Sequence, residues 1–186
     1  KEPEVPGAAS REVLAQRLNV LAYWLYLITA MVVAMVVIGG LTRLTNSGLS
    51  MVEWRPLTGW LPPLSELDWA LVFHKYKTSP EYREINVGMS LLEFKGIFWL
   101  EYFHRLWGRI IGLVFVIPFI IFAACGWISW HLGLRLLGLL ILGGLQGALG
   151  WYMVQSGLID IPHVSHFRLA AHLLLAIFIL GFILWL

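Results

Sequence analysis

Four long apolar runs divide the chain, and each is long enough to cross a lipid bilayer. The hydrocarbon core of a bilayer is about 30 Å thick and needs roughly 20 residues of helix. The runs predict a membrane domain over residues 20–186 with four helices, at about residues 20–41, 98–125, 134–154 and 168–186. Because short connections join the last three helices, we expect these to be antiparallel neighbours. The pattern indicates an all-α fold, a transmembrane four-helix bundle.

Two segments depart from the apolar pattern. Residues 1–19 form a polar N-terminal tail, and residues 42–97 form a long loop that carries most of the charged residues. Within this loop Ser65 and Asp68 have the spacing of a helix cap, which predicts a short helix from about Ser65 to Tyr76. A loop of this length is usually functional, although a passive connector outside the membrane is the alternative.

Composition and charge agree with a membrane protein and exclude several other classes. Apolar residues make up 59% of the 186 residues and charged residues only 13%, against about 45–50% and about 25% in soluble domains. The net charge of +2 is too small to indicate a nucleic-acid partner, so the lipid bilayer is the expected surrounding. Cys125 is the single cysteine, which excludes a disulfide or a Cys-x-x-Cys redox centre within this sequence.

The stretch EYFHRLWGR, at the head of the second apolar run, concentrates ionisable groups. Such groups are costly at a membrane span unless something pairs with them. On a helix, one face of this region carries Glu101, His104, Arg105, Gly108 and Gly112. A haem requires an axial imidazole, space for the macrocycle and cations for the propionates. His104, the glycines and the guanidinium groups of Arg105 and Arg109 supply these three features.

His172 offers a second axial ligand at a matching depth. It lies near the start of the fourth apolar run, and Arg168 precedes it by one helical turn. The second and fourth helices of an up-down-up-down bundle run parallel, so His104 and His172 lie close to the same membrane face. The pair predicts a haem iron bound by two histidines, with Arg168 as a further contact for a propionate.

Ordinary structural roles stay open for the same residues. An intramembrane histidine often forms hydrogen bonds between helices, and Glu101 can pair with Arg105 one turn away as an interfacial ion pair. His163 and His166 precede the fourth helix on the side of His104, as reserve ligands or as surface residues.

Four stretches resemble the amino-terminal half of the haem A synthase family. They are GGLTRLTNSGLSMVEW at 39–54, EYFHRLWGR at 101–109, QGALGWYMVQSGL at 146–158 and RLAAH at 168–172. The resemblance extends over nearly the whole chain after about residue 20. Some members of the family carry a cysteine pair in the first long loop. The corresponding loop here has none, so the chain resembles the cysteine-free branch.

The resemblance implies an eight-helix, pseudo-symmetric membrane enzyme, of which this chain supplies one four-helix half. The last apolar run reaches Leu186 without a polar cap, which agrees with a longer polypeptide. Members of the family oxidise a porphyrin methyl group of haem O to a formyl group, making haem A for cytochrome oxidase. The resemblance assigns the substrate haem O to this half, with His104 and His172 at its iron, and a haem b cofactor to the second half. It makes Glu101 the catalytic carboxylate.

Partners and location follow from the same resemblance. The expected partners are the haem O synthase that supplies the substrate and an electron donor such as a ferredoxin system, and a homo-oligomer stays open. The expected location is a bacterial cell membrane or the mitochondrial inner membrane, with the N-terminus in the cytoplasm or matrix. The Lys and Arg count of the long loop, taken alone, favours a cytoplasmic loop. We follow the resemblance, which places the loop on the other side.

Two other functions are compatible with the same residues. A b-type cytochrome domain with two histidine ligands would transfer electrons and leave the porphyrin unmodified. A haem-free channel or transporter subunit would show no haem absorbance at all. Identification of the extracted pigment separates these three hypotheses.

Overall fold

The computed structural model describes residues 8–55, 58–159 and 162–186. These residues form six helices and no strand. The helices are α1 (Ala8–Leu44), α2 (Glu66–Tyr76), α3 (Pro80–Glu84), α4 (Leu91–Ala124), α5 (Trp130–Leu158) and α6 (His166–Trp185). Four of them, α1, α4, α5 and α6, are long and apolar enough to cross a membrane. The prediction of an all-α integral membrane protein with four spanning helices is confirmed.

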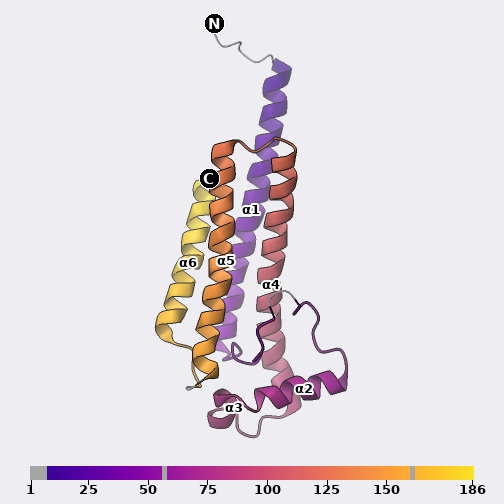
Figure 1. Ribbon diagram of the computed structural model, residues 1–186, viewed down its shortest axis with the longest axis vertical. Coiled ribbons are helices and arrows are strands. Elements are labelled where there is room, and N and C mark those ends of the chain that lie inside the picture. The colour runs from indigo at the N-terminus through magenta and orange to yellow at the C-terminus, as the bar shows by residue number, and fades with distance from the viewer. Residues whose placement is uncertain (1–7, 56–57, 160–161) are drawn as a thin grey trace.

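The four long helices form one antiparallel bundle (Figure 1). α1 packs against α4 and α6, and α5 packs against the same two helices. α4 and α6 therefore lie diagonally opposite each other, and their N-terminal ends are at the same end of the bundle. Figure 1 shows α2 and α3 below that end. The two helices with the predicted haem ligands thus run parallel on opposite sides of the bundle interior.

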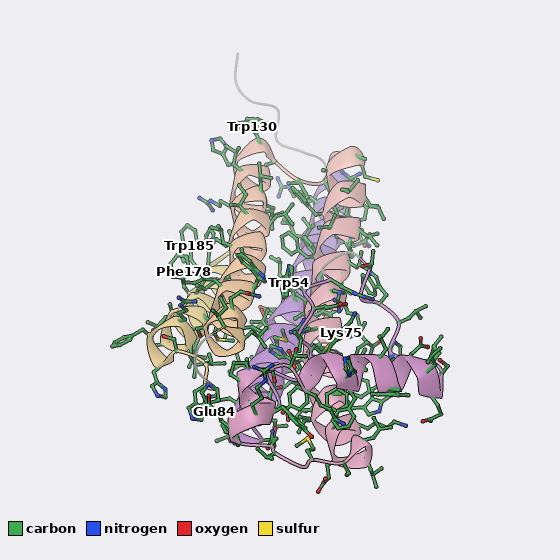
Figure 2. The ribbon with its side chains drawn as sticks, turned by 60° about the horizontal axis from the view of Figure 1, so that its bottom comes forward. Trp54, Lys75, Glu84, Trp130, Phe178 and Trp185 are labelled. Atoms are coloured by element: carbon green, nitrogen blue, oxygen red, sulfur yellow. The ribbon has the colours of Figure 1, made fainter. Side chains whose placement is uncertain are left out.

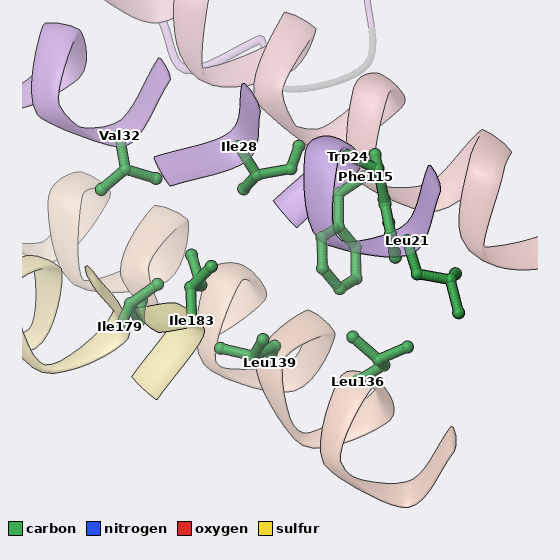
Figure 3. Close-up of a cluster of buried hydrophobic side chains, with 9 residues drawn as sticks. All are labelled: Leu21, Trp24, Ile28, Val32, Phe115, Leu136, Leu139, Ile179 and Ile183. Carbon is green, nitrogen blue, oxygen red and sulfur yellow. The ribbon is translucent and has the colours of Figure 1, made fainter. Parts of the chain in front are cut away.

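The bundle has its apolar core in the half away from α2 and α3. Large side chains from all four long helices meet there (Figure 3). They are Leu21, Trp24, Ile28 and Val32 of α1, Phe115 of α4, Leu136 and Leu139 of α5, and Ile179 and Ile183 of α6. The indole N–H of Trp24 donates to the carbonyl of Val114 at 2.8 Å, so its polar atom is satisfied inside the core.

The outer surface of the bundle is apolar, as expected of a surface that contacts lipid. Trp130, Phe178 and Trp185 lie at the periphery (Figure 2), and their side chains are 76%, 59% and 66% exposed. In water such large apolar groups would be unfavourable, whereas in a bilayer they contact hydrocarbon or its interface.

All four long helices begin earlier than the apolar runs predict, and the difference is largest for α1 and α4. α1 begins at Ala8, inside the predicted polar tail, and residues 1–7 of that tail lie outside the described residues. α4 begins at Leu91 because Ser90 and Glu93 form a capping box there. Hydropathy marks the part of a helix that lies in hydrocarbon, whereas caps mark where the helix itself begins.

The long loop is a folded cap built on α2 and α3. As predicted, Ser65 caps α2, and its Oγ accepts from the backbone N–H of Asp68 at 3.1 Å. α2 packs against α4, and α3 packs against α5. The contact with α4 is aromatic and comprises Trp69, Phe73, Tyr76, Phe94, Phe98 and Tyr102. This apolar packing makes the described part of the loop a structured part of the domain.

Candidate functional site

His104 and His172 each lie against a glycine of an adjacent helix. A Cβ built on Gly39 of α1 would be 3.2 Å from Nε2 of His104. A Cβ built on Gly150 of α5 would be 3.1 Å from Cε1 of His172. Both separations are tighter than ordinary packing, so a larger residue at either position would displace an imidazole. The two glycines therefore leave the space that the two imidazoles occupy.

The glycines predicted beside His104 on its own helix have other surroundings. A Cβ on Gly108 would be 3.3 Å from Cε of Met35, so Gly108 packs against α1. Gly112 is exposed on the bundle surface, with no described atom within 4 Å of a Cβ built there. The room beside the histidines comes from glycines on α1 and α5, which reasoning within a single helix could not identify.

His172 has a polar neighbour that the sequence did not reveal, Gln146 of α5. Its Nε2 donates to the backbone carbonyl of His172 at 3.0 Å and lies 3.3 Å from the imidazole Nε2. Within the part of the chain that the structure describes, Gln146 Oε1 and His172 Nδ1 are buried without a hydrogen-bond partner. Buried polar atoms almost always have partners in folded proteins, so these two atoms are an exception at the predicted site.

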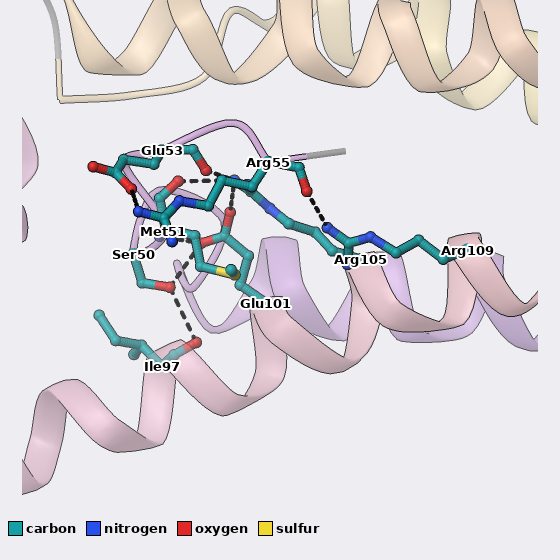
Figure 4. Close-up of polar contacts among 8 residues, drawn as sticks. All are labelled: Ser50, Met51, Glu53, Arg55, Ile97, Glu101, Arg105 and Arg109. Carbon is teal, nitrogen blue, oxygen red and sulfur yellow. Dashed lines mark hydrogen bonds and ion pairs between the residues drawn. The ribbon is translucent and has the colours of Figure 1, made fainter. Parts of the chain in front are cut away.

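Glu101 anchors the segment that follows α1 (Figure 4). Its side chain is 3% exposed. Oε2 accepts hydrogen bonds from Ser50 Oγ at 2.7 Å and from the backbone N–H of Met51 at 2.8 Å. Oε1 accepts from Arg105 in an ion pair one helical turn away. The ion pair that the sequence left open as an alternative is therefore present, and the carboxylate joins α4 to residues 50–55.

Arg105 and Arg109 hold the same segment through its carbonyl groups. Arg105 donates to the carbonyl of Met51 at 2.9 Å and to that of Glu53 at 3.1 Å. Arg109 donates to the carbonyl of Arg55 at 2.8 Å. Figure 4 shows these bonds along one side of α4. Residues 50–55 are thus fixed along α4 by one carboxylate and two guanidinium groups.

A cavity of about 290 Å³ lies between residues 50–55, the cap and α4. Its basic side chains are Arg55, Lys75, Arg105 and Arg109, and its acidic side chains are Glu53 and Asp68. Glu53 is paired with Arg55 at 2.5 Å and also with Lys75, whose hydrogen bond lowers the pKa of Glu53. The excess of basic groups suits an anionic group such as a carboxylate.

Arg168, the third arginine predicted to contact a propionate, lies against α5. It donates to the carbonyl of Tyr152 at 2.7 Å, and its guanidinium carbon is 3.7 Å from the centre of the Tyr152 ring. His166 begins α6 and His163 precedes it, at the bundle end where Arg168 lies. The structure therefore groups Arg105 and Arg109 with Glu101, and it holds Arg168 apart from them on α6.

Besides the two glycines of α1 and α5, sequence reasoning missed three residues that form hydrogen bonds at this site. Ser50 and Met51 bind Glu101, and Gln146 contacts His172. All three lie in the stretches 39–54 and 146–158 that carry the family resemblance. Membership of those stretches was the available signal, because sequence spacing does not reveal a contact between residues fifty positions apart.

A second buried carboxyl, Glu81, lies in the cap. It is 3% exposed and accepts a hydrogen bond from the hydroxyl of Tyr76 at 2.9 Å, and that hydroxyl accepts one from Asn86 at 2.7 Å. Burial raises the pKa of Glu81 to about 7, and the negative charge of Glu101 adds to this effect. The same burial raises the pKa of the Tyr76 hydroxyl. At neutral pH Glu81 is therefore close to its titration point.

We expect the stability of the protein to fall between pH 4.5 and about 7 because of Glu81. In this interval the folded protein keeps a proton that the unfolded chain, with a carboxyl pKa of 4.5, has released. The stabilising effect is complete below pH 4.5 and is lost as the pH rises through 7. Each unit of pKa difference corresponds to about 1.4 kcal/mol, so a few kcal/mol is the upper limit.

The measurement is the thermal midpoint in detergent between pH 4.5 and 8, for the native protein and for Glu81→Gln. In Glu81→Gln the thermal midpoint should fall much less over this pH range, because glutamine does not titrate. Glu84→Gln is the matched control, since Glu84 is exposed on the same short helix. An unchanged decline in Glu81→Gln would show that Glu81 does not titrate in this range.

Most of this sequence is similar to known proteins of one family. Residues 22–186 match the model of a protein family described as "Cytochrome oxidase assembly protein". A protein of Paramagnetospirillum magneticum named "Heme A synthase" is 58% identical over 165 residues, covering 89% of this chain and 47% of that protein. One of Nitrosomonas eutropha with the same name is 52% identical over 181 residues, covering 97% and 51%.

The chain therefore spans about half the length of the curated relatives that it matches. No solved structure matches it significantly. The family match contains both histidines, Glu101 and residues 50–55. It also contains the whole of α4, α5 and α6. Since the match also covers far more than half of the sequence, the chain belongs to the cytochrome oxidase assembly protein family.

Proposed function

We propose that this chain is the substrate-binding half of a haem A synthase, which oxidises a methyl group of haem O to a formyl group. The observation that carries the proposal is the position of His104 and His172 on diagonal helices, at one end of the bundle, each beside a glycine of its neighbour. The relatives named "Heme A synthase", at 58% and 52% identity, support the reaction. The porphyrin iron supplies the redox chemistry when haem is bound.

The residues present fit a haem in their donor chemistry. Two imidazoles suit haem iron as axial ligands. His172 Nδ1 and Gln146 Oε1 are buried without partners among the described residues, as is understandable for a site completed by a further group. We infer that His104 and His172 bind the iron of haem O, while Arg105, Arg109 and Arg168 are candidates for its propionates. The basic lining of the cavity near Arg105 and Arg109 agrees with this role.

Glu101 is the proposed catalytic carboxylate, as a proton acceptor or as the partner of a developing positive charge. It precedes His104 by one helical turn, so both side chains belong to the same face of α4. Its bonds to Ser50, Met51 and Arg105 fix its position. They give Glu101 a positioning role as well, because the segment that it holds along α4 would keep water from a bound substrate.

The rest of the enzyme is proposed from the family. A second four-helix half would hold a haem b cofactor, a haem O synthase would deliver the substrate, and a ferredoxin-type donor would supply electrons. The membrane would be a bacterial cell membrane or the mitochondrial inner membrane. The N-terminus of this chain would lie in the cytoplasm or matrix, with the cap on the opposite side.

Expression in cells that make haem O but lack their own haem A synthase tests the proposed function. The full-length protein that contains this chain should cause haem A to accumulate among the extracted haems. Bound haem with no haem A formed would instead favour the electron-transferring cytochrome. Absence of any haem absorbance from the purified protein would favour the channel or transporter.

We expect Glu101→Gln to fold and to bind haem, although with lower stability because Arg105 loses its ion-pair partner. We expect it to lower haem A formation per bound haem by roughly 10²-fold or more, the usual contribution of a general base. The glutamine oxygen can still accept from Ser50 and Met51, so the segment at residues 50–55 stays in place while the charge is lost. The assay is haem A produced per bound haem. Glu53→Gln is the control, because Glu53 is a partly exposed carboxylate of the same segment. Native turnover in Glu101→Gln would leave Glu101 with its positioning role alone.

A further inference from the structure

α2 exposes a group of leucines on a side that does not pack against α4. Leu67 and Leu71, one helical turn apart, are 79% and 53% exposed. Leu61 and Leu64, which precede the helix, are 74% and 75% exposed. Single apolar residues are common on protein surfaces, whereas a contiguous apolar patch marks a surface that binds a partner or a membrane. These four residues are called the leucine face below.

The leucine face is on the side of α2 that is directed towards the bundle. Leu64 and Leu71 line the cavity that also contains Arg109. Trp69 of α2 packs on Phe98 of α4, with 5.0 Å between the ring centres. Arg109 is three helical turns further into the bundle along α4 than Phe98. The side of α2 that borders the cavity therefore points back along α4, towards the membrane-spanning part of the bundle.

Another side of α2 is polar and is directed away from the bundle. Glu66 pairs with Lys95 at 3.3 Å, and the Glu66 side chain is 82% exposed. Lys95 is nearer than Phe98 to the N-terminal end of α4. Asp68, a charged residue beside the leucine face, accepts hydrogen bonds from residues 64 and 65 in the capping turn, so its charge is stabilised locally. α2 is thus an amphipathic helix.

α2 also lies at the level of a membrane surface. A span of about 20 residues counted back from Ala124, the end of α4, places the edge of the hydrocarbon near Arg105. Phe98, on which α2 packs, is two helical turns beyond Arg105, or about 11 Å. Since a helix with its side chains has a radius of about 5–6 Å, the leucine face reaches into the interfacial layer. Figure 1 shows α2 running across the direction of the long helices, as a helix in the plane of the membrane would.

Aromatic side chains connect α2 with the lipid-facing surface of α4. The ring centre of Trp99 is 5.7 Å from that of Trp69 on α2 and 5.7 Å from that of Phe103. Phe103 is 54% exposed, two residues before Arg105. Aromatic residues of this kind are enriched where a protein crosses from hydrocarbon to water. The apolar surface of the bundle therefore continues onto α2.

We propose that the leucine face contacts the lipid leaflet on the cap side of the membrane, and that α2 lies in the interface as an amphipathic helix. Glu66 and Asp68 balance the basic residues of α2, so burial of apolar area is the source of the contact and anionic lipids are not required. The contact holds the cap, together with the cavity that it covers, at the membrane surface. The proposal depends on the membrane-spanning bundle and not on the reaction proposed above.

The test uses the full-length protein that contains this chain, in phosphatidylcholine bilayers, with its native cysteines replaced by serine. Leu67→Cys and Leu71→Cys each carry one nitroxide spin label on the leucine face. Electron paramagnetic resonance measures collisions of the label with molecular oxygen, which partitions into hydrocarbon, and with a nickel chelate, which stays in water. We expect collisions with oxygen to exceed those with the chelate several-fold at both positions.

Glu66→Cys is the matched control, because it places the same label on the polar side of the same helix. There the nickel chelate should collide more often than oxygen. Chelate collisions at positions 67 and 71 equal to those at position 66 would place α2 in water and overturn the proposal. Few collisions with either reagent would show that protein covers the leucine face, either the second half of the enzyme or another copy, and would overturn it as well. Leu64→Cys samples the same face if either leucine variant fails to fold.

Discussion

Replacement of His104 or His172 by alanine should abolish haem A formation and weaken haem O binding by more than about 100-fold. Loss of a group that only orients a metal ligand costs 10–100-fold in metal affinity, and loss of the ligand itself costs more. Each imidazole lies against a glycine on a neighbouring helix, and a glycine has no side chain that could take its place. The measurements are haem A produced by cells and haem O titrated into each purified variant.

The two histidines should also have equivalent effects on the haem spectrum. Either variant should convert a low-spin ferric spectrum of the bound substrate to a high-spin one, since one axial ligand remains. His131→Ala is the matched control, because His131 is exposed near the start of α5, at the end of the bundle away from His104 and His172. Retention of the low-spin substrate spectrum in both variants would reduce the histidines to hydrogen-bonding groups between helices, the structural alternative.

Arg105→Met should lower the free energy of unfolding by about 3–5 kcal/mol. Arg105 and Glu101 form an ion pair whose side chains are 10% and 3% exposed. Removal of one partner leaves the other charge buried without compensation, which accounts for a loss of this size. The same change removes two hydrogen bonds to the carbonyls of residues 51 and 53. Limited proteolysis should therefore cut residues 50–55 faster in the variant.

The double variant Glu101→Gln with Arg105→Met should recover part of the lost stability, because it no longer contains a buried unpaired charge. Lys95→Met is the matched control, since Lys95 pairs with Glu66 and the Glu66 side chain is 82% exposed. An exposed ion pair contributes roughly 0–1 kcal/mol. Equal losses in Arg105→Met and Lys95→Met would mean that Glu101 and Arg105 do not form the buried anchor described above.

The sequence predicted those parts of the molecule that depend on local pattern. Apolar runs located the four spanning helices, and the spacing of Ser65 and Asp68 located the start of α2. Helical spacing and parallel topology placed His104 and His172 at one end of the bundle. These predictions succeed because each rests on a period or a cap that a short window of sequence contains.

The parts that were missed depend on contacts between distant segments. Ser50 meets Glu101 across fifty-one positions, and Gln146 meets His172 across twenty-six. Gly39 and Gly150 make room for histidines on other helices. A single sequence does not state which faces of two helices meet, so these partners became visible only once the bundle was assembled.

The most direct test of the central claim is identification of the porphyrins bound to the full-length protein purified from cells that make haem O. Extraction followed by chromatography and mass measurement distinguishes haem O and haem A from haem b. We expect haem O, haem A or the alcohol between them in the native protein, and loss of these porphyrins in the variant with both His104 and His172 replaced by alanine. Haem b as the only porphyrin in the native protein, or unchanged haem O and haem A in the double variant, would contradict the account.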